Sequence, residues 1–243
     1  MNTLYLVLTA LCGNLNSTEK SDYVVSQNGA VWNLRIEKIL QRDEMSRILG
    51  IAKERSARTY TFLATCANTG LRLSEVGHIH ADDVLPRCQL RITRRKKRTL
   101  QPIVIDISPQ LAAILEEWKQ MFDGYLWPGN AKPCIIHRSK KGVALEPEYA
   151  CQGGHISLRV IQRDWALICA EAGLRMHGRG IHSTRHFAIT EFYDKHRDLR
   201  AAQVFAGHSS SQMTEKYAAV REMKEKVNAM EAMLYLEGLC PLI

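Results

Sequence analysis

The sequence lacks the features that mark membrane-spanning and secreted chains. Its apolar stretch from Leu4 to Cys12 is too short to cross a bilayer, which takes about 20 residues. No Lys or Arg precedes Lys20, so that stretch also lacks the basic flank of a secretory signal. We therefore expect a soluble, cytoplasmic protein in which residues 1–34 form a poorly specified leader.

Disulfide and metal-binding patterns are absent as well. The seven cysteines form no Cys-x-x-Cys pair and are odd in number, which argues against a disulfide framework and against a zinc site. No cluster of Asp and Glu has the spacing of a metal site. We expect reduced thiols, no cofactor and chemistry without a metal. The cysteines are Cys12, Cys66, Cys88, Cys134, Cys151, Cys169 and Cys240.

Basic residues outnumber acidic ones along the chain. The 243 residues include 33 Lys and Arg against 25 Asp and Glu, which gives a formal net charge of +8. This surplus suggests an anionic partner, because neutralising phosphates releases counterions and favours binding. Charge alone leaves DNA, RNA and an acidic membrane surface as alternatives. The hydrophobic fraction of 46% is ordinary for a globular chain with a real core.

Apolar periodicity predicts a mostly helical fold with a small antiparallel sheet. From about Ile36, and again over residues 57–68, apolar side chains recur at helical spacing, and Gly70 suits the end of the second helix. Arg72 then stands at the head of a short helix. Further helices are predicted over residues 157–172, 185–193, 199–205 and 212–219.

The hairpin prediction rests on a change of period. Residues 89–93 and 103–107 alternate apolar and polar side chains, which is typical of strands. The connection between them is basic, so the hairpin has a basic tip. Ser108 and Pro109 follow and suit a helix start, with Ser as the N-cap and Pro in the first turn.

Residues suited to chemistry gather between Ile181 and Val220. This stretch contains His182-x-x-Arg185-His186, then Gly207-His208, then Tyr217, and the segment from Thr69 to Glu75 reads T-G-L-R-L-S-E. In order and spacing these motifs resemble the tyrosine recombinases of the phage integrase family. That family has a T-G-x-R-x-S-E box, a hairpin lysine, H-x-x-R, G-H and a final tyrosine. The resemblance covers about residues 36–220 and implies an integrase-type catalytic domain.

The resemblance also implies a role for each motif residue. Arg72 and Arg185 would neutralise the phosphate in the transition state, since each guanidinium is a rigid fork of donors. His208 would hydrogen bond a non-bridging oxygen, and His182 would assist proton transfer at the tyrosine hydroxyl. Tyr217 would attack phosphorus and keep the bond energy in a 3′-phosphotyrosyl link, without ATP.

The basic hairpin tip would supply the lysine that protonates the leaving 5′ oxygen. It reads Arg94-Arg95-Lys96-Lys97-Arg98. One sequence does not decide between Lys96 and Lys97; we favour Lys97. We expect Arg94, Arg95, Lys96 and Arg98 to bind DNA.

The expected function is site-specific DNA recombination by an integrase-like enzyme of a mobile element. The resemblance implies double-stranded DNA as partner, a homotetramer on that DNA and no membrane. Integration, excision, inversion and resolution share one active site, so the motifs do not choose among them. Two alternatives remain: a type IB topoisomerase-like enzyme, and a non-catalytic integrase remnant that binds DNA.

The expected division of the chain departs from the family pattern. Residues 1–34 are too few for the helical core-binding domain that most members carry before the catalytic domain, which we place at residues 35–220. A short relative without that domain and a truncated gene are both compatible with this. Residues 221–243 read as a C-terminal helix with a coiled-coil-like apolar seam. We expect it to dock on a neighbouring protomer or on its own.

Overall fold

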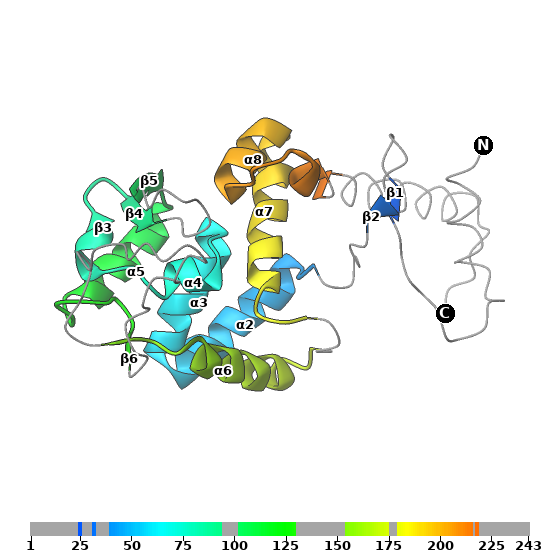
Figure 1. The fold of residues 1–243 in the computed structure, drawn as a ribbon. Coiled ribbons are helices and arrows are strands. Elements are labelled where there is room, and N and C mark those ends of the chain that lie inside the picture. Colours follow the sequence, from blue (N-terminus) through cyan, green and yellow to red (C-terminus); the bar gives the residue numbers. More distant parts are fainter. Residues whose placement is uncertain are drawn as a thin grey trace, which may run out of the picture.

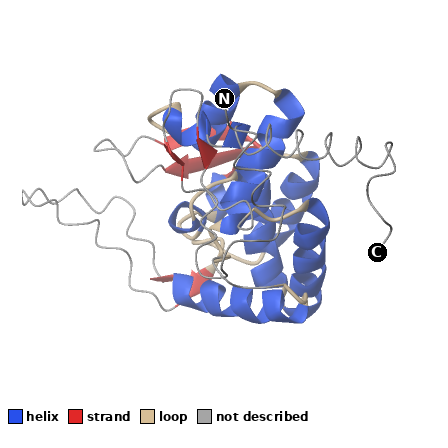
Figure 2. Ribbon diagram, turned by 90° about the vertical axis from the view of Figure 1, so that its right-hand side faces the viewer, coloured by secondary structure: helices blue, strands red, loops and turns tan. Residues whose placement is uncertain are grey.

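The computed structural model of the chain describes residues 24–25, 31–32, 39–93, 102–129, 154–174, 179–215 and 217–218. Within them, helices make up most of the structure and the strands are short (Figure 2). None of the described helices is long and apolar enough to cross a membrane. The elements of the first half are β1 (Val24–Val25), β2 (Val31–Trp32), α2 (Arg42–Arg55), α3 (Ala57–Thr69), α4 (Leu73–Val76), η2 (Ala81–Asp83), β3 (Val84–Leu85) and β4 (Gln89–Thr93). Those of the second half are β5 (Pro102–Asp106), α5 (Pro109–Lys119), β6 (Pro128–Gly129), β7 (Gly154–His155), α6 (Leu158–Glu171), α7 (Ser183–His196) and α8 (Leu199–Ala206).

The helices α2 and α3 pack on each other and are joined by a single residue, Ser56. The first begins later than the sequence predicts, because Gln41 caps it and its backbone N–H donates to Glu44 at 2.8 Å. Ser56 caps α3 by accepting from the backbone N–H of Thr59. Gly70 ends α3 at φ +62°, a left-handed conformation that costs glycine little. The predicted end of this helix is therefore confirmed.

The predicted hairpin is confirmed within one residue at each strand. β4 and β5 pair antiparallel, with Leu90 opposite Ile105 and Ile92 opposite Ile103. Leu90 and Ile92 are fully buried and face the core. The short strand β3 adds a third member on the other side of β4, and β1–β2 and β6–β7 form two further two-stranded sheets.

A continuous core joins the sheet to α3, α5 and α6. Trp127 and Phe62 meet edge to face with ring centroids 5.0 Å apart, and the Trp127 indole N–H donates to Thr61 at 3.0 Å. Trp165 of α6 donates in the same way to the backbone carbonyl of Arg179 at 3.1 Å. Both indoles bury their rings and still satisfy their N–H groups, which fixes where these elements sit.

α7 connects the core to the C-terminal elements. Figure 1 shows it (yellow) with α8 at one end and with α2 and α6 toward the other. It packs on both α3 and α8, and Phe192, near the C-terminal end of α7, stacks on Phe205 of α8 with ring centroids 4.3 Å apart. The left-handed Gly207 then ends α8. The chain leaves α8 beside α7, and this return brings Tyr217 back to that helix.

Candidate active site

Arg72 is held at the start of α4 by a buried carboxylate. Glu75 accepts from the backbone N–H of Arg72 at 2.8 Å and from its Nη1 at 2.9 Å. The side chain of Glu75 is 2% exposed, whereas that of Arg72 is 24% exposed. The carboxylate therefore orients the guanidinium from the protein side and leaves part of it open to a ligand.

Arg185 lies in the first turn of α7 and is buried. Its Nη1 donates to the carbonyl of Gly70, and its Nη2 donates to the carbonyl of Ala206 at 2.6 Å. Those carbonyls stand at the C-terminal ends of α3 and α8, where the helix dipole and unpaired carbonyls favour a cation. The Arg185 guanidinium thus connects the backbone two residues before Arg72 to the backbone two residues before His208.

Tyr217 contacts two histidines, His186 and His208. Its hydroxyl oxygen is 2.8 Å from Nδ1 of His186 on α7. The ring of His208 lies nearly parallel to the Tyr217 ring, at an angle of 13° and a centroid distance of 6.3 Å. Thr214 Oγ1 fixes His208 from the other side, 2.9 Å from its Nδ1. The phenol therefore has an imidazole as an immediate proton partner.

Burial changes the acidity of this phenol. Tyr217 is 2% exposed, and its burial raises the pKa of the hydroxyl to about 12, because the phenolate would lose its hydration. The positive charge of Arg185 acts in the opposite direction and lowers that pKa, but less strongly. At neutral pH the hydroxyl keeps its proton in this arrangement.

His182 stands just before α7 and is exposed. Its ring meets that of His186 at right angles, with centroids 5.3 Å apart. The spacing of four residues places both rings on one face of the helix. A chain of ring contacts therefore runs from exposed His182 through half-buried His186 to buried Tyr217.

Comparison with known proteins identifies the family. Residues 38–224 match the model of the phage integrase family. The chain belongs to the phage integrase family. It is 24% identical over 185 residues to the tyrosine recombinase XerC of Proteus mirabilis, in a match covering 75% of this chain and 54% of that protein. The chain thus spans little more than half the length of this curated relative.

Solved structures of phage integrase type share the fold. The XerH site-specific recombinase, bound to a palindromic difH substrate in a post-cleavage complex, superposes with a TM-score of 0.59 at 20% identity, covering 91% of this chain and 59% of that one. A lambda integrase tetramer bound to a Holliday junction gives a TM-score of 0.53 at 17% identity, covering 74% of this chain and 47% of that one. The predicted fold class, mostly helical with a small antiparallel sheet, is confirmed.

The integrase motifs converge only in part within the described structure. Arg185, His208 and Tyr217 come together around the end of α8, and His182 joins them through His186. The five basic residues of the hairpin tip lie outside the described residues: Arg94, Arg95, Lys96, Lys97 and Arg98. Among the described residues no group of three or more His, Cys, Asp and Glu side chains is arranged to hold a metal ion.

His186 is the residue that sequence reasoning did not assign to the integrase site. Two signals in the sequence pointed to it. It directly follows Arg185, and it lies four residues after His182, so a helix through this motif places both imidazoles on one face. The structure adds what the sequence did not contain, namely the contact with Tyr217.

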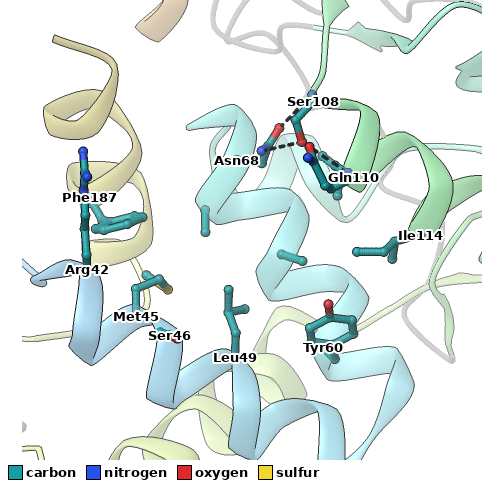
Figure 3. A pocket seen from close by; sticks show the side chains of 13 residues that line it. Arg42, Met45, Ser46, Leu49, Tyr60, Asn68, Ser108, Gln110, Ile114 and Phe187 are labelled. Carbon is teal, nitrogen blue, oxygen red and sulfur yellow. Dashed lines mark hydrogen bonds between the residues drawn. The ribbon is translucent and has the colours of Figure 1, made fainter. Parts of the chain in front are cut away.

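The described residues also form a groove whose lining includes none of the side chains around Tyr217. An open, mostly apolar groove runs between α2, α3 and α5, with Phe187 of α7 at its rim (Figure 3). At its polar end Asn68 and Ser108 bond to each other, with Asn68 Nδ2 donating to Ser108 Oγ at 3.0 Å. Arg42, also at the rim, pairs with Glu191. The groove therefore does not carry the acid, base and nucleophile set found around Tyr217.

Proposed function

We propose that the chain is the catalytic part of a site-specific tyrosine recombinase that cuts and rejoins double-stranded DNA through a 3′-phosphotyrosyl intermediate. One observation carries this: the Tyr217 hydroxyl lies 2.8 Å from an imidazole, in a fold that belongs to the phage integrase family. A tyrosine attacks phosphorus only if a group takes its proton, and here that partner is in place.

The proposed division of labour follows from exposure and charge. Arg72 presents a partly open guanidinium to the scissile phosphate, and Arg185 adds positive charge beneath it. His208 donates to a non-bridging oxygen, and exposed His182 takes part in proton transfer. The leaving 5′ oxygen takes its proton from the hairpin, from Lys97 or its neighbour Lys96.

The burial of Tyr217 adds one requirement to this function. A hydroxyl that is covered in the DNA-free chain has to be uncovered before it reaches a phosphate. We place that rearrangement in the DNA-binding step, where contacts to the backbone phosphates by Arg94, Arg95, Lys96 and Arg98 contribute binding energy. The net charge of +8 is consistent with a DNA partner.

Assembly is the second part of the proposal. The lambda integrase of similar fold is a tetramer on a Holliday junction, and we propose that this chain also acts as four protomers on paired DNA sites. Residues 35–220 would be the catalytic unit, and residues 221–243 would dock on a neighbouring protomer. Removal of residues 222–243 should then impair synapsis while single-site cleavage persists. Unchanged synapsis would contradict docking between protomers.

The deciding experiment is relaxation of a supercoiled plasmid in EDTA. The plasmid carries the DNA that flanks the gene, and the unaltered chain is compared with Tyr217→Phe. Tyr193→Phe is the matched control, since it removes a hydroxyl from a half-buried tyrosine of α7. We expect relaxation and a covalent protein–DNA adduct with the unaltered chain and the control, and neither with Tyr217→Phe, which should still bind DNA. Binding without an adduct in all three would favour a non-catalytic integrase remnant.

A further inference from the structure

The hydrogen bond between His186 and Tyr217 joins a proton source to a proton acceptor. Nδ1 of His186 and the Tyr217 hydroxyl are 2.8 Å apart, within the usual range for a strong hydrogen bond. The two rings are tilted by 38° with centroids 5.7 Å apart, so the ring edge of His186 points toward the hydroxyl rather than stacking on the phenol. His186 is half-buried and lies in the same turn of α7 as Arg185.

The protonation states that fit this contact follow from the surroundings. Since burial raises the pKa of Tyr217 to about 12, the hydroxyl is protonated at neutral pH and has a hydrogen to donate. A neutral imidazole that carries its own hydrogen on Nε2 accepts that hydrogen at Nδ1. Histidine is the side chain best suited to exchange a proton near neutral pH, so an imidazole at this position fits the transfer.

We propose that His186 is a catalytic residue that stays paired with Tyr217 when DNA binding uncovers the hydroxyl and accepts its proton during cleavage, an assignment that rests on the proposed function. As the Tyr217 oxygen forms its bond to phosphorus, the bond from phosphorus to the 5′ oxygen breaks. The phenolic proton passes to Nδ1 of His186, and the 5′ oxygen takes a proton from a lysine of the hairpin. Rejoining reverses each transfer, so no proton or electron is left over.

Further titratable and charged groups lie near the His186–Tyr217 pair. The ring of His182, the residue just before α7, contacts the ring of His186, and Arg185 precedes His186 in the chain. His208, beyond α8, lies nearly parallel to the ring of Tyr217. His182, being exposed, would connect this pair to solvent.

The test measures the rate of adduct formation in a single turnover on a DNA substrate that the unaltered chain cleaves. His186→Ala should slow the adduct by about 10²–10⁴-fold, the range for loss of a general base. Added imidazole should raise the rate of adduct formation by His186→Ala at least about tenfold, because imidazole enters the space left by the side chain and takes the proton. His196→Ala is the matched control: it removes an exposed histidine near the C-terminal end of α7 and should change the rate by less than about threefold.

A conservative variant separates proton transfer from positioning. His186→Asn keeps a hydrogen-bonding group near the hydroxyl but takes up no proton at neutral pH. If His186→Asn has the same thermal unfolding midpoint as the unaltered chain, its rate of adduct formation should be as low as that of His186→Ala. A His186→Asn rate near that of the unaltered chain, or a His186→Ala loss that imidazole leaves unchanged, would overturn the proposal and reduce His186 to a positioning role. If the unaltered chain forms no adduct on any substrate, the proposed function itself is overturned.

Discussion

The buried phenol of Tyr217 predicts a particular loss of stability at alkaline pH. Its pKa rises from the ordinary value of 10.0 to about 12 on folding. The pKa of Tyr217 is higher in the folded state than in the unfolded state. The contribution of this residue to the unfolding free energy is therefore complete below the unfolded-state pKa and is lost as the pH rises toward the folded-state pKa. Two pKa units correspond to about 2.7 kcal/mol, of which about half, roughly 1.4 kcal/mol, is lost between about pH 9 and about pH 11.

The assay compares urea unfolding of the unaltered chain and Tyr217→Phe at these two pH values. Phenylalanine fills nearly the same volume and has no proton to lose, so the other ionising groups contribute equally to both chains. The unaltered chain should lose about 1.4 kcal/mol more of its unfolding free energy than the variant between the two pH values. Spectrophotometric titration should show one fewer tyrosine ionising near pH 12 in the variant. If the unfolding free energies of the unaltered chain and of Tyr217→Phe fall by the same amount, within about 0.3 kcal/mol, the burial argument is refuted.

Three further predictions concern the scaffold of the site. Gly70→Ala should destabilise the chain more than Gly173→Ala: both positions have positive φ, at a strain cost of about 1–2 kcal/mol, but only at Gly70 would the added Cβ meet an aromatic ring at 3.0 Å. Equal urea midpoints would contradict this. Glu75→Gln should weaken the hold on Arg72, lowering stability by about 1–3 kcal/mol and slowing adduct formation; unchanged values in both would remove Glu75 from the site. Arg185→Ala leaves two helix-end carbonyls without their donor and should cost about 2–6 kcal/mol, which a thermal midpoint equal to that of the unaltered chain would refute.

Local signals in the sequence were sufficient for most of the helices and the hairpin. The alternation over residues 89–93 located β4, and the Ser108-Pro109 pair located the start of α5, where Ser108 accepts from the backbone N–H of Leu111. Gly70 ends α3, as predicted, and adopts the left-handed conformation there. These features depend on residues a few positions apart, which is why a single sequence reveals them.

Contacts across long stretches of chain could not be predicted in this way. The strands β3, β6 and β7 have two residues each, and they form because tertiary packing brings their partners alongside. The bond from Arg185 to Gly70 spans 115 positions and involves a backbone carbonyl, which no motif encodes. The motif order did indicate that Tyr217 and the histidines belong together. It did not indicate that His186 is the one at the hydroxyl.

The hydrogen bonds from Arg185 to the carbonyls of Gly70 and Ala206 affect how the sequences of related genes should be interpreted. A copy that has lost its chemistry but still folds in this way needs a side chain that links the ends of α3 and α8, so selection for folding alone retains this arginine. Its presence is weak evidence of an active enzyme. The exposed imidazole of His182 and the hydroxyl of Tyr217 are more informative, since a phenylalanine would fill the same buried space as Tyr217. Decayed copies should therefore lose these two groups first and the buried arginine last.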